Sequence, residues 1–380
     1  MRTRWYGRGI LVGAAGLMAY GFAPSAAAAP ARHATKLPKT LTVYSQGDVN
    51  VQTEWQKVLV PLFERSHPGT KVKLVFTTDS SENTDVYDEI AAAAKAGKST
   101  QFDVVDGSVP AEAATANLLV KVNTKEIPNL KKIQPSEFKP VYNEAVPLRG
   151  SQVLLAYNST AVKNPPKTLS ALISWIKANP GKFAYCNPSD GGSGEGFVQD
   201  VVSAYTSKAN NDKFALGYAP NLESAWNKGF SVLKSIGPDI FQHQYPNSNT
   251  GVVTLLASGA IDMGTVWSDQ GTAALKDGQL PSTIKLTGIT PAMPGGPDYL
   301  GVPKNIPKAY QQLAFEFINW TLKANIQADI VKVMHGTPGV EFKYLPKSYQ
   351  KLFAGYPAPA LPYSAKSSSD MESDWTNQVG

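Results

Sequence analysis

The sequence is poor in the residues on which many enzymes and metal sites depend. Its 380 residues include one cysteine, Cys186, and four histidines. A single cysteine forms no disulfide within the chain, and no histidine lies at metal-ligand spacing from the cysteine or from another histidine. The sequence therefore predicts no metal, no cofactor and no catalytic residue. Paired carboxylates for glycoside hydrolysis stay open, because their separation in space is invisible in a sequence.

The chain also lacks the clustered positive charge of a nucleic-acid-binding protein. Its formal net charge is +6, from 36 Lys and Arg against 30 Asp and Glu. Three of the arginines lie within the first eight residues, and without them the charge is about +3, with no long basic run elsewhere. We therefore expect no nucleic acid among the partners.

The first residues have the three parts of a secretory signal peptide. Arginines precede an apolar run at 10–22, and small residues at 24–29 follow the Ala-x-Ala pattern that a signal peptidase cleaves. The apolar run is shorter than the ~20 residues that span a bilayer. We predict a cleaved signal peptide over 1–28 and a short tether over 29–40. Because no cysteine lies near the cleavage point, we expect a periplasmic protein without a lipid anchor.

Two parts of the mature chain alternate strand and helix patterns. From 41 to 108, three strand patterns alternate with two helix patterns, and the pattern begins again after 153. Such alternation predicts parallel sheets with helices on their faces, and ligands at the carboxyl ends of the strands. We predict an α/β protein with a first lobe at 41–152 and 290–335, a second lobe at 153–289, and a C-terminal segment at 336–380 that packs on both.

A glycine-rich loop at 187–196 joins a strand to a helix in the second lobe. It lacks the lysine and hydroxyl of a nucleotide P-loop, and Phe197 stands where a dinucleotide loop needs its third glycine. The Gly-x-Ser-x-Gly spacing of a nucleophile elbow fails as well. Two interpretations remain: backbone N–H groups offered to ligand oxygens at a helix N-terminus, or a tight turn with positive φ angles.

Several segments, taken in order, resemble the extracellular solute-binding proteins of bacterial ABC importers. The first is Leu-Phe-Glu-Arg-Ser-His-Pro-Gly at 62–69, and the crossing strand at 152–158 ends in a Tyr-Asn pair. The others are at 93–97 before 102–105, 113–122, 166–172 with 179–183, and 255–262. The resemblance covers about residues 40 to 340. It implies the type II periplasmic-binding fold, in which two lobes, each a mostly parallel sheet flanked by helices, are joined by extended hinge strands and close on a ligand.

Within that family, the glycine-rich loop, Trp267-Ser-Asp269 and residues 278–281 are most similar to the thiamine-binding and polyamine-binding group. Iron-binding relatives carry an adjacent tyrosine pair, which does not occur here. The resemblance places twelve positions in cleft loops: Gln46, Thr78, Asp79, Asp106, Ser108, Tyr157, Ser189, Asp190, Ser193, Trp267, Asp269 and Tyr299. Of these we favour Trp267, because an aromatic ring at a strand end can stack on a sugar, a heterocycle or an ammonium group.

The charge of the ligand stays open at this point. Five aspartates at strand ends favour a cation, although Asp before a helix is also a common N-cap worth ~1 kcal/mol. They are Asp48, Asp79, Asp106, Asp190 and Asp269. Helix N-termini favour anionic oxygens instead. A thiamine-like solute would suit both signals, a polyamine only the first, and neutral sugars remain possible.

The resemblance implies a monomeric receptor that is not an enzyme. It would capture a small polar solute, thiamine-like or polyamine-like, and deliver it to an inner-membrane ABC permease. The alternatives are a carbohydrate-binding member of the same family and a hydrolase acting in the cleft.

Overall fold

The structure, a computed structural model, describes residues 38–78, 82–352 and 356–380. The predicted signal peptide, most of the tether and Asp79 lie outside these residues. No helix in the described part of the chain is both long and apolar enough to cross a membrane.

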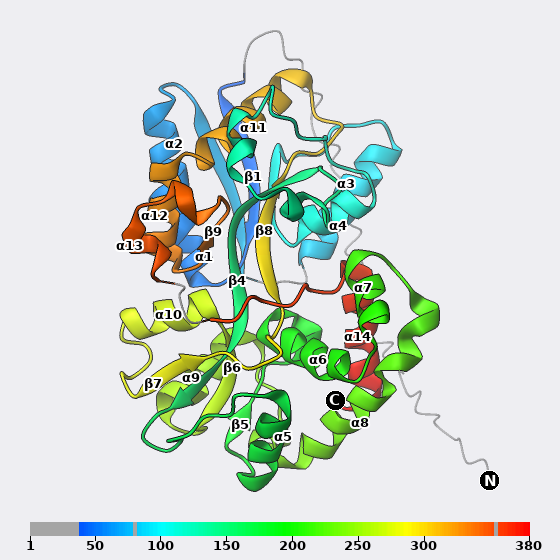
Figure 1. The fold of residues 1–380 in the computed structure, drawn as a ribbon. Helices are drawn as coiled ribbons and strands as arrows, with labels where there is room; N and C mark the ends of the chain where they lie inside the picture. Colours follow the sequence, from blue (N-terminus) through cyan, green and yellow to red (C-terminus); the bar gives the residue numbers. More distant parts are fainter. Residues whose placement is uncertain (1–37, 79–81, 353–355) are drawn as a thin grey trace, which may run out of the picture. The chain divides into compact units, whose positions relative to one another are not determined.

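One long strand, β4 (Ala145–Asn158), belongs to both halves of the sheet (Figure 1). Residues 145–152 pair with β8 (Gly295–Gly301), and residues 153–157 pair with β6 (Met263–Trp267). The strand order is β2-β1-β3-β8-β4-β6-β5, with β7 and β9 also paired to β4. The remaining strands are β1 (Thr40–Gln46), β2 (Lys71–Thr77), β3 (Val104–Gly107), β5 (Phe183–Ala184), β7 (Ile284–Thr287) and β9 (Thr337–Pro338).

The predicted fold class is confirmed as a mixed α/β fold. The pairs β1–β2, β1–β3 and β5–β6 are parallel, as expected where helices connect successive strands. The crossing strands β4 and β8 run antiparallel to their neighbours. The crossing strand predicted at 152–158 is the second half of β4, which begins seven residues earlier.

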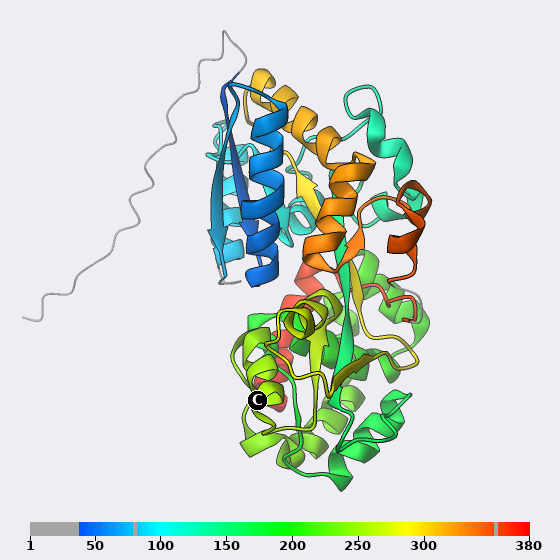
Figure 2. The ribbon, with the colours of Figure 1, turned by 90° about the vertical axis from the view of Figure 1, so that its left-hand side faces the viewer.

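Helices flank both halves of the sheet. In the first half they are α1 (Val49–Thr53), the π-helix η1 (Glu54–Leu59), α2 (Val60–Ser66), α3 (Glu82–Lys95), α4 (Val109–Thr115), η2 (Pro128–Lys132), η3 (Pro135–Phe138), α11 (Lys308–Thr321) and α12 (Ala324–Met334). We call these helices, with β1–β3, the first lobe. Figure 2 shows the blue helical segment α1–α2 running along strands β1 and β2.

The second lobe consists of β5–β7 and the helices that precede and connect them. These helices are α5 (Leu169–Ala178), η4 (Pro188–Asp190), α6 (Gly192–Ala204), α7 (Lys208–Leu216), η5 (Pro220–Trp226), α8 (Asn227–Ile236), η6 (Gly237–Asp239), η7 (Phe241–His243), α9 (Ser248–Ser258) and α10 (Ser268–Lys276). The C-terminal segment adds η8 (Phe342–Tyr344), α13 (Lys347–Gln350) and α14 (Ala365–Gln378). The lobe boundaries predicted above remain a prediction.

Each lobe has its own buried apolar core. In the first lobe the predicted helix face is buried, with Trp55 and Phe63 packed against Phe317 of α11. In the second lobe Phe197 of α6 and Phe230 of α8 lie in one cluster. Burial of such side chains contributes roughly 1.5–3 kcal/mol each, so the cores position the polar residues between them.

Candidate functional site

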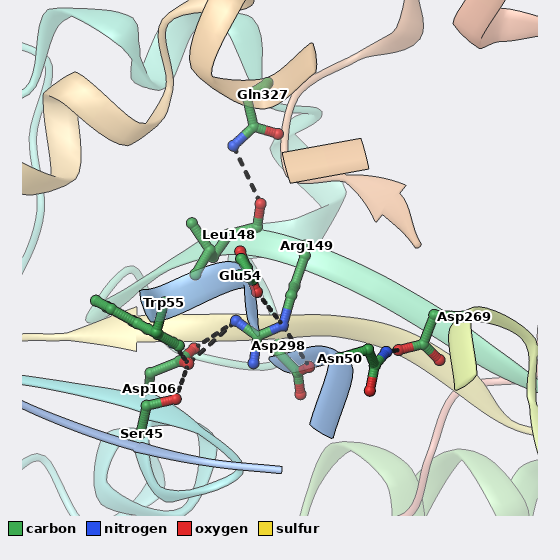
Figure 3. Close-up of polar contacts among 10 residues, drawn as sticks. All are labelled: Ser45, Asn50, Glu54, Trp55, Asp106, Leu148, Arg149, Asp269, Asp298 and Gln327. Carbon is green, nitrogen blue, oxygen red and sulfur yellow. Dashed lines mark hydrogen bonds and ion pairs between the residues drawn. The ribbon is translucent and has the colours of Figure 1, made fainter. Parts of the chain in front are cut away.

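A buried arginine on the crossing strand organises the polar residues next to the hinge (Figure 3). Arg149 of β4 is 1% exposed, and its Nη1 donates to both oxygens of Asp106 at 3.0 Å. Its Nε lies 3.2 Å from Glu54 Oε2 and 3.5 Å from Asp298 Oδ2. One cation therefore faces three carboxylates.

The local structure explains why these side chains converge. The π-helix η1 begins at Glu54 and turns both Glu54 and Trp55 inward, and both residues are fully buried. Trp55 Nε1 donates to Asp106 Oδ2 at 2.8 Å, and Ser45 Oγ donates to the same oxygen at 2.7 Å. Asp106 thus has partners for both oxygens within the protein. This geometry favours a structural role for Asp106, and its role as a ligand contact stays a prediction.

Burial makes two of the carboxyl groups near Arg149, those of Glu54 and Asp298, reluctant to ionise. It raises the pKa of Glu54 to about 8, although the charge of Arg149 opposes the shift. It also raises the pKa of Asp298 to about 6, again against the effect of Arg149. The carboxylates of Asp106 and Glu54 raise the pKa of Arg149, outweighing its own burial. Near neutral pH Glu54 is therefore mainly protonated, and Asp298 mainly ionised.

Two aspartates accept hydrogen bonds from asparagines of the opposite lobe. Asn50 of α1 donates to Asp269 Oδ2 of α10 at 2.8 Å, and Asn249 of α9 donates to Asp48 Oδ2 at 3.3 Å. Asp269 is 7% exposed, and its second oxygen, Oδ1, has no hydrogen-bond partner. Burial raises the pKa of both aspartates, while the asparagine hydrogen bonds lower it. A buried carboxylate oxygen without a donor favours an N–H or ammonium group.

The geometry does not favour helix capping as the role of these aspartates. Asp48 occupies the N-cap position of α1 but its side chain makes no capping hydrogen bond. Asp269 lies inside the first turn of α10, whose N-cap position is Trp267. Asp106 bonds to Ser45, Trp55 and Arg149. The side chain of Asp190 and all of Asp79 are not described.

A second group of predicted residues meets at the ends of β1 and β3. Asn83 donates to Gln46 Oε1 at 3.3 Å and to Ser108 Oγ at 3.1 Å, and it accepts from Tyr44 Oη. Ser108 is exposed at the start of α4, and Thr78 is exposed after β2. The structure thus brings Gln46 and Ser108 together through an asparagine that the sequence did not single out.

The glycine-rich loop is packed against its own lobe. Ser193 is fully buried: its N–H donates to Asn249 Oδ1 at 2.9 Å and its Oγ to the Thr265 carbonyl at 3.1 Å. Ser189, which is exposed, lies 2.9 Å from Thr376 of α14. It lines a surface hollow of about 360 Å³, and another hollow, of about 440 Å³, lies beside Lys167 and Tyr356. Neither hollow is lined by Asp48, Asp269 or Asp298.

The predicted aromatic residues are far apart. Trp267 pairs with Val153 beside the crossing point, whereas Tyr157 pairs with Met263 at the other end of β6. Four residues of strand separate the two sites, about 13 Å. Tyr299 is buried in the first lobe and donates to the Glu137 carbonyl at 3.1 Å. Of the three, only Trp267 lies next to Asp269.

Sequence reasoning missed the residues that connect this site. They are Asn50, Glu54, Asn83, Arg149, Asn249 and Asp298. Polar side chains at 54 and 149, inside patterns that otherwise predict buried faces, were the available signal. In the described ranges, no three His, Cys, Asp or Glu side chains form a group that could hold a metal.

Comparison with known proteins identifies the family. A family model described as bacterial extracellular solute-binding protein matches residues 59–354, more than half of the chain. Protein YnjB of Escherichia coli (strain K12) is 23% identical over 254 residues, 63% of this chain and 64% of that protein. The match thus spans less than two thirds of that relative.

Solved structures show the same fold. The spermidine/putrescine ABC transporter substrate-binding protein PotD of Streptococcus pneumoniae has a TM-score of 0.64 at 15% identity, over 90% of this chain and 99% of that chain. AfuA of Actinobacillus pleuropneumoniae, solved with fructose-6-phosphate, has a TM-score of 0.65 at 14% identity over the same shares. The family match over most of the chain, together with this fold, shows that the chain belongs to the bacterial extracellular solute-binding proteins.

Proposed function

We propose that this protein captures a small cationic solute, thiamine-like or polyamine-like, between its two lobes. Membership of the family implies a small-molecule ligand, a membrane ABC permease as partner and a place outside the cytoplasm. The cationic character of the solute, the cleaved signal peptide, the absence of a lipid anchor and the monomeric state are parts of the proposal.

The observation that carries the proposal is the excess of carboxylates where the two lobes meet. Asp48, Asp269 and Asp298 surround this region, and among the contacts described Arg149 is the cation paired with Asp298. The electrostatic influence of Asp48 and Asp298 on neighbouring carboxyl groups supports their proximity. A positively charged solute would relieve the repulsion among these groups, and an anionic solute would increase it.

The unpartnered oxygen of Asp269 supports a solute that carries N–H groups. A hydrogen bond from a charged donor to a buried carboxylate contributes about 1.5–3 kcal/mol. Trp267, two residues earlier, could cover the face of the same cation. PotD, from a spermidine/putrescine transporter, and AfuA, solved with fructose-6-phosphate, have equally similar folds, so the fold leaves the ligand class open.

A thermal-shift panel on the mature protein tests the proposal. The panel contains spermidine, putrescine, thiamine, glucose and fructose-6-phosphate, each at 1 mM. A compound at ~100 times its Kd adds ~2.7 kcal/mol, which is a shift of several degrees. We expect shifts with cations only, and a smaller shift in Asp269→Asn. Shifts with sugars or phosphates alone would contradict the cationic solute and favour the carbohydrate-binding alternative.

A further inference from the structure

We infer that Asn249 is a positioning residue that holds the two lobes together, and that the glycine-rich loop holds the side chain of Asn249 in place. The side chain of Asn249 has contacts on both sides of the lobe boundary. Its Oδ1 accepts the Ser193 N–H at 2.9 Å within the second lobe, and its Nδ2 donates to Asp48 of the first lobe at 3.3 Å. Cys186 Sγ, at 3.5 Å, is a third neighbour.

Gly192 makes room for this asparagine. A Cβ atom at Gly192 would stand 2.7 Å from Asn249 Oδ1 and 3.0 Å from its Nδ2. Cβ atoms essentially never lie closer than 3.0 Å to another heavy atom, so any larger residue at this position would displace the amide of Asn249. Gly192 also has a φ of +75°, which favours glycine. The loop therefore has an explanation that requires neither a phosphate nor a nucleophile.

A second hydrogen bond joins the lobes in the opposite direction, from an asparagine of the first lobe to an aspartate of the second. Asn50 of the first lobe donates to Asp269 of the second at 2.8 Å, so each lobe contributes one asparagine and one aspartate. The two bonds join residues 201 and 219 positions apart. Local chain geometry cannot impose such contacts, and each must form when the lobes approach.

This inference rests on the proposed function only in that lobe closure is the step that captures a solute. The closure contacts themselves need no particular ligand. They can therefore be tested without added solute, and their failure is distinguishable from a failure of the cationic-solute proposal.

Distances between two spin labels measure the separation of the lobes. The labels are attached at Lys73→Cys and Lys228→Cys, exposed positions of the first and second lobes, while the native Cys186 is buried. We expect Asn249→Ala and Gly192→Ala to raise the ratio of molecules with a long label separation to molecules with a short one. The factor should be the same for both variants, about threefold to tenfold for one hydrogen bond. The double variant should show no further increase.

Gly259→Ala is the matched control. Gly259 has a φ of +73° in the same lobe, but nothing lies within 4 Å of a Cβ there, so this variant has the backbone strain without the clash. Gly259→Ala should show the label distances of the parent protein. Asn50→Ala removes the other hydrogen bond between the lobes and should lengthen the distances independently of Asn249. Unchanged distances in Asn249→Ala would overturn the positioning role. If Asn249→Ala changed the distances but Gly192→Ala did not, the glycine-rich loop would not be what positions Asn249. Equal changes in Gly259→Ala and Gly192→Ala would lead to the same conclusion.

Discussion

The side chain of Arg149 shows how a single residue determines the character of a site. A guanidinium in a protein core needs carboxylate partners, because burying an unpaired charge costs several kcal/mol. Asp106 and Asp298 provide them, and the carboxyl group of Glu54 contacts the same guanidinium, so the acidic groups exceed the arginine in number. Burial raises the pKa of Glu54 and Asp298, and the negative charge of the neighbouring aspartates adds to both shifts.

Glu54→Gln should reduce the dependence of stability on pH. The pKa of Glu54 is raised from 4.5 to about 8 on folding, so its contribution is fully present below pH 4.5 and is lost as the pH rises through 8. We expect the free energy of unfolding to fall less between pH 5 and pH 8 in the variant, by about 3–4 kcal/mol. Urea denaturation at both pH values measures this difference.

Glu126→Gln, at an exposed position, is the control. Its free energy of unfolding should change with pH as that of the parent protein does. The pKa values of Asp200 and Glu223 are also raised, both to about 7. These two groups therefore change the stability with pH in the same direction as Glu54, and they do so in the parent protein and in both variants. Equal pH slopes for the parent and Glu54→Gln would show that Glu54 is ionised in the folded protein across this range.

At the scale of elements, the C-terminal helix α14 fixes the surroundings of the glycine-rich loop. It packs on the second lobe through Met371 and Trp375, both buried. The Trp375 ring lies 4.7 Å from Tyr245, and its Nε1 donates to Tyr185 Oη at 3.3 Å. The family match ends at residue 354, before this helix begins.

Trp375→Ala should therefore destabilise the second lobe. Truncating a buried tryptophan leaves a cavity and costs about 3–5 kcal/mol. Trp375→Phe retains most of the ring packing and loses the hydrogen bond, so about 1 kcal/mol is expected. Urea unfolding followed by circular dichroism measures both variants. A cost below 1 kcal/mol for the alanine variant would indicate that α14 is only loosely attached.

At the scale of the whole molecule, the two lobes place carboxylates from distant parts of the chain around one region. Asp48 comes from the first lobe, Asp269 from the second, and Asp298 from the crossing strand β8. In the proposed function lobe closure assembles them, and a cationic solute stabilises the closed arrangement by its differential affinity for it. Solute affinity should then depend on the ionisation of these groups.

The affinity for spermidine should weaken as the pH falls. The carboxyl of Asp298 has a pKa of about 6, so at pH 5 it is mainly protonated and attracts a cation less. We expect binding at pH 5 to be about tenfold weaker than at pH 7, as measured by calorimetry. Asp298→Asn should bind weakly at both pH values with a smaller dependence. An affinity that rises on acidification would contradict the prediction.

Much of the fold could be predicted from the sequence because its signals are local. Alternation of apolar residues identified β1, β2 and β3, and the spacing of Trp55, Leu59 and Phe63 identified a buried helix face. These patterns reflect the periods of strands and helices, which each segment carries by itself. The π-helix within that segment was not predicted, because its extra residue per turn does not alter the apolar face enough to be recognised.

The candidate site was only partly predictable. Trp267, Asp269, Gln46 and Ser108 follow strands, and the sequence singled them out for that reason. Asn50 and Asn249 carry no local signal, because their partners in the opposite lobe are 219 and 201 positions away.

By itself the sequence determined the class of fold, the family and the order of the segments, since these depend on periodicity and motif order along the chain. Only the tertiary structure decided that Asp106 pairs with a buried arginine, that Gly192 accommodates Asn249, and that each lobe holds an aspartate of the other. The physical reason is that burial, hydrogen bonding and charge repulsion are set by neighbours in space, which the chain acquires only when both lobes are assembled.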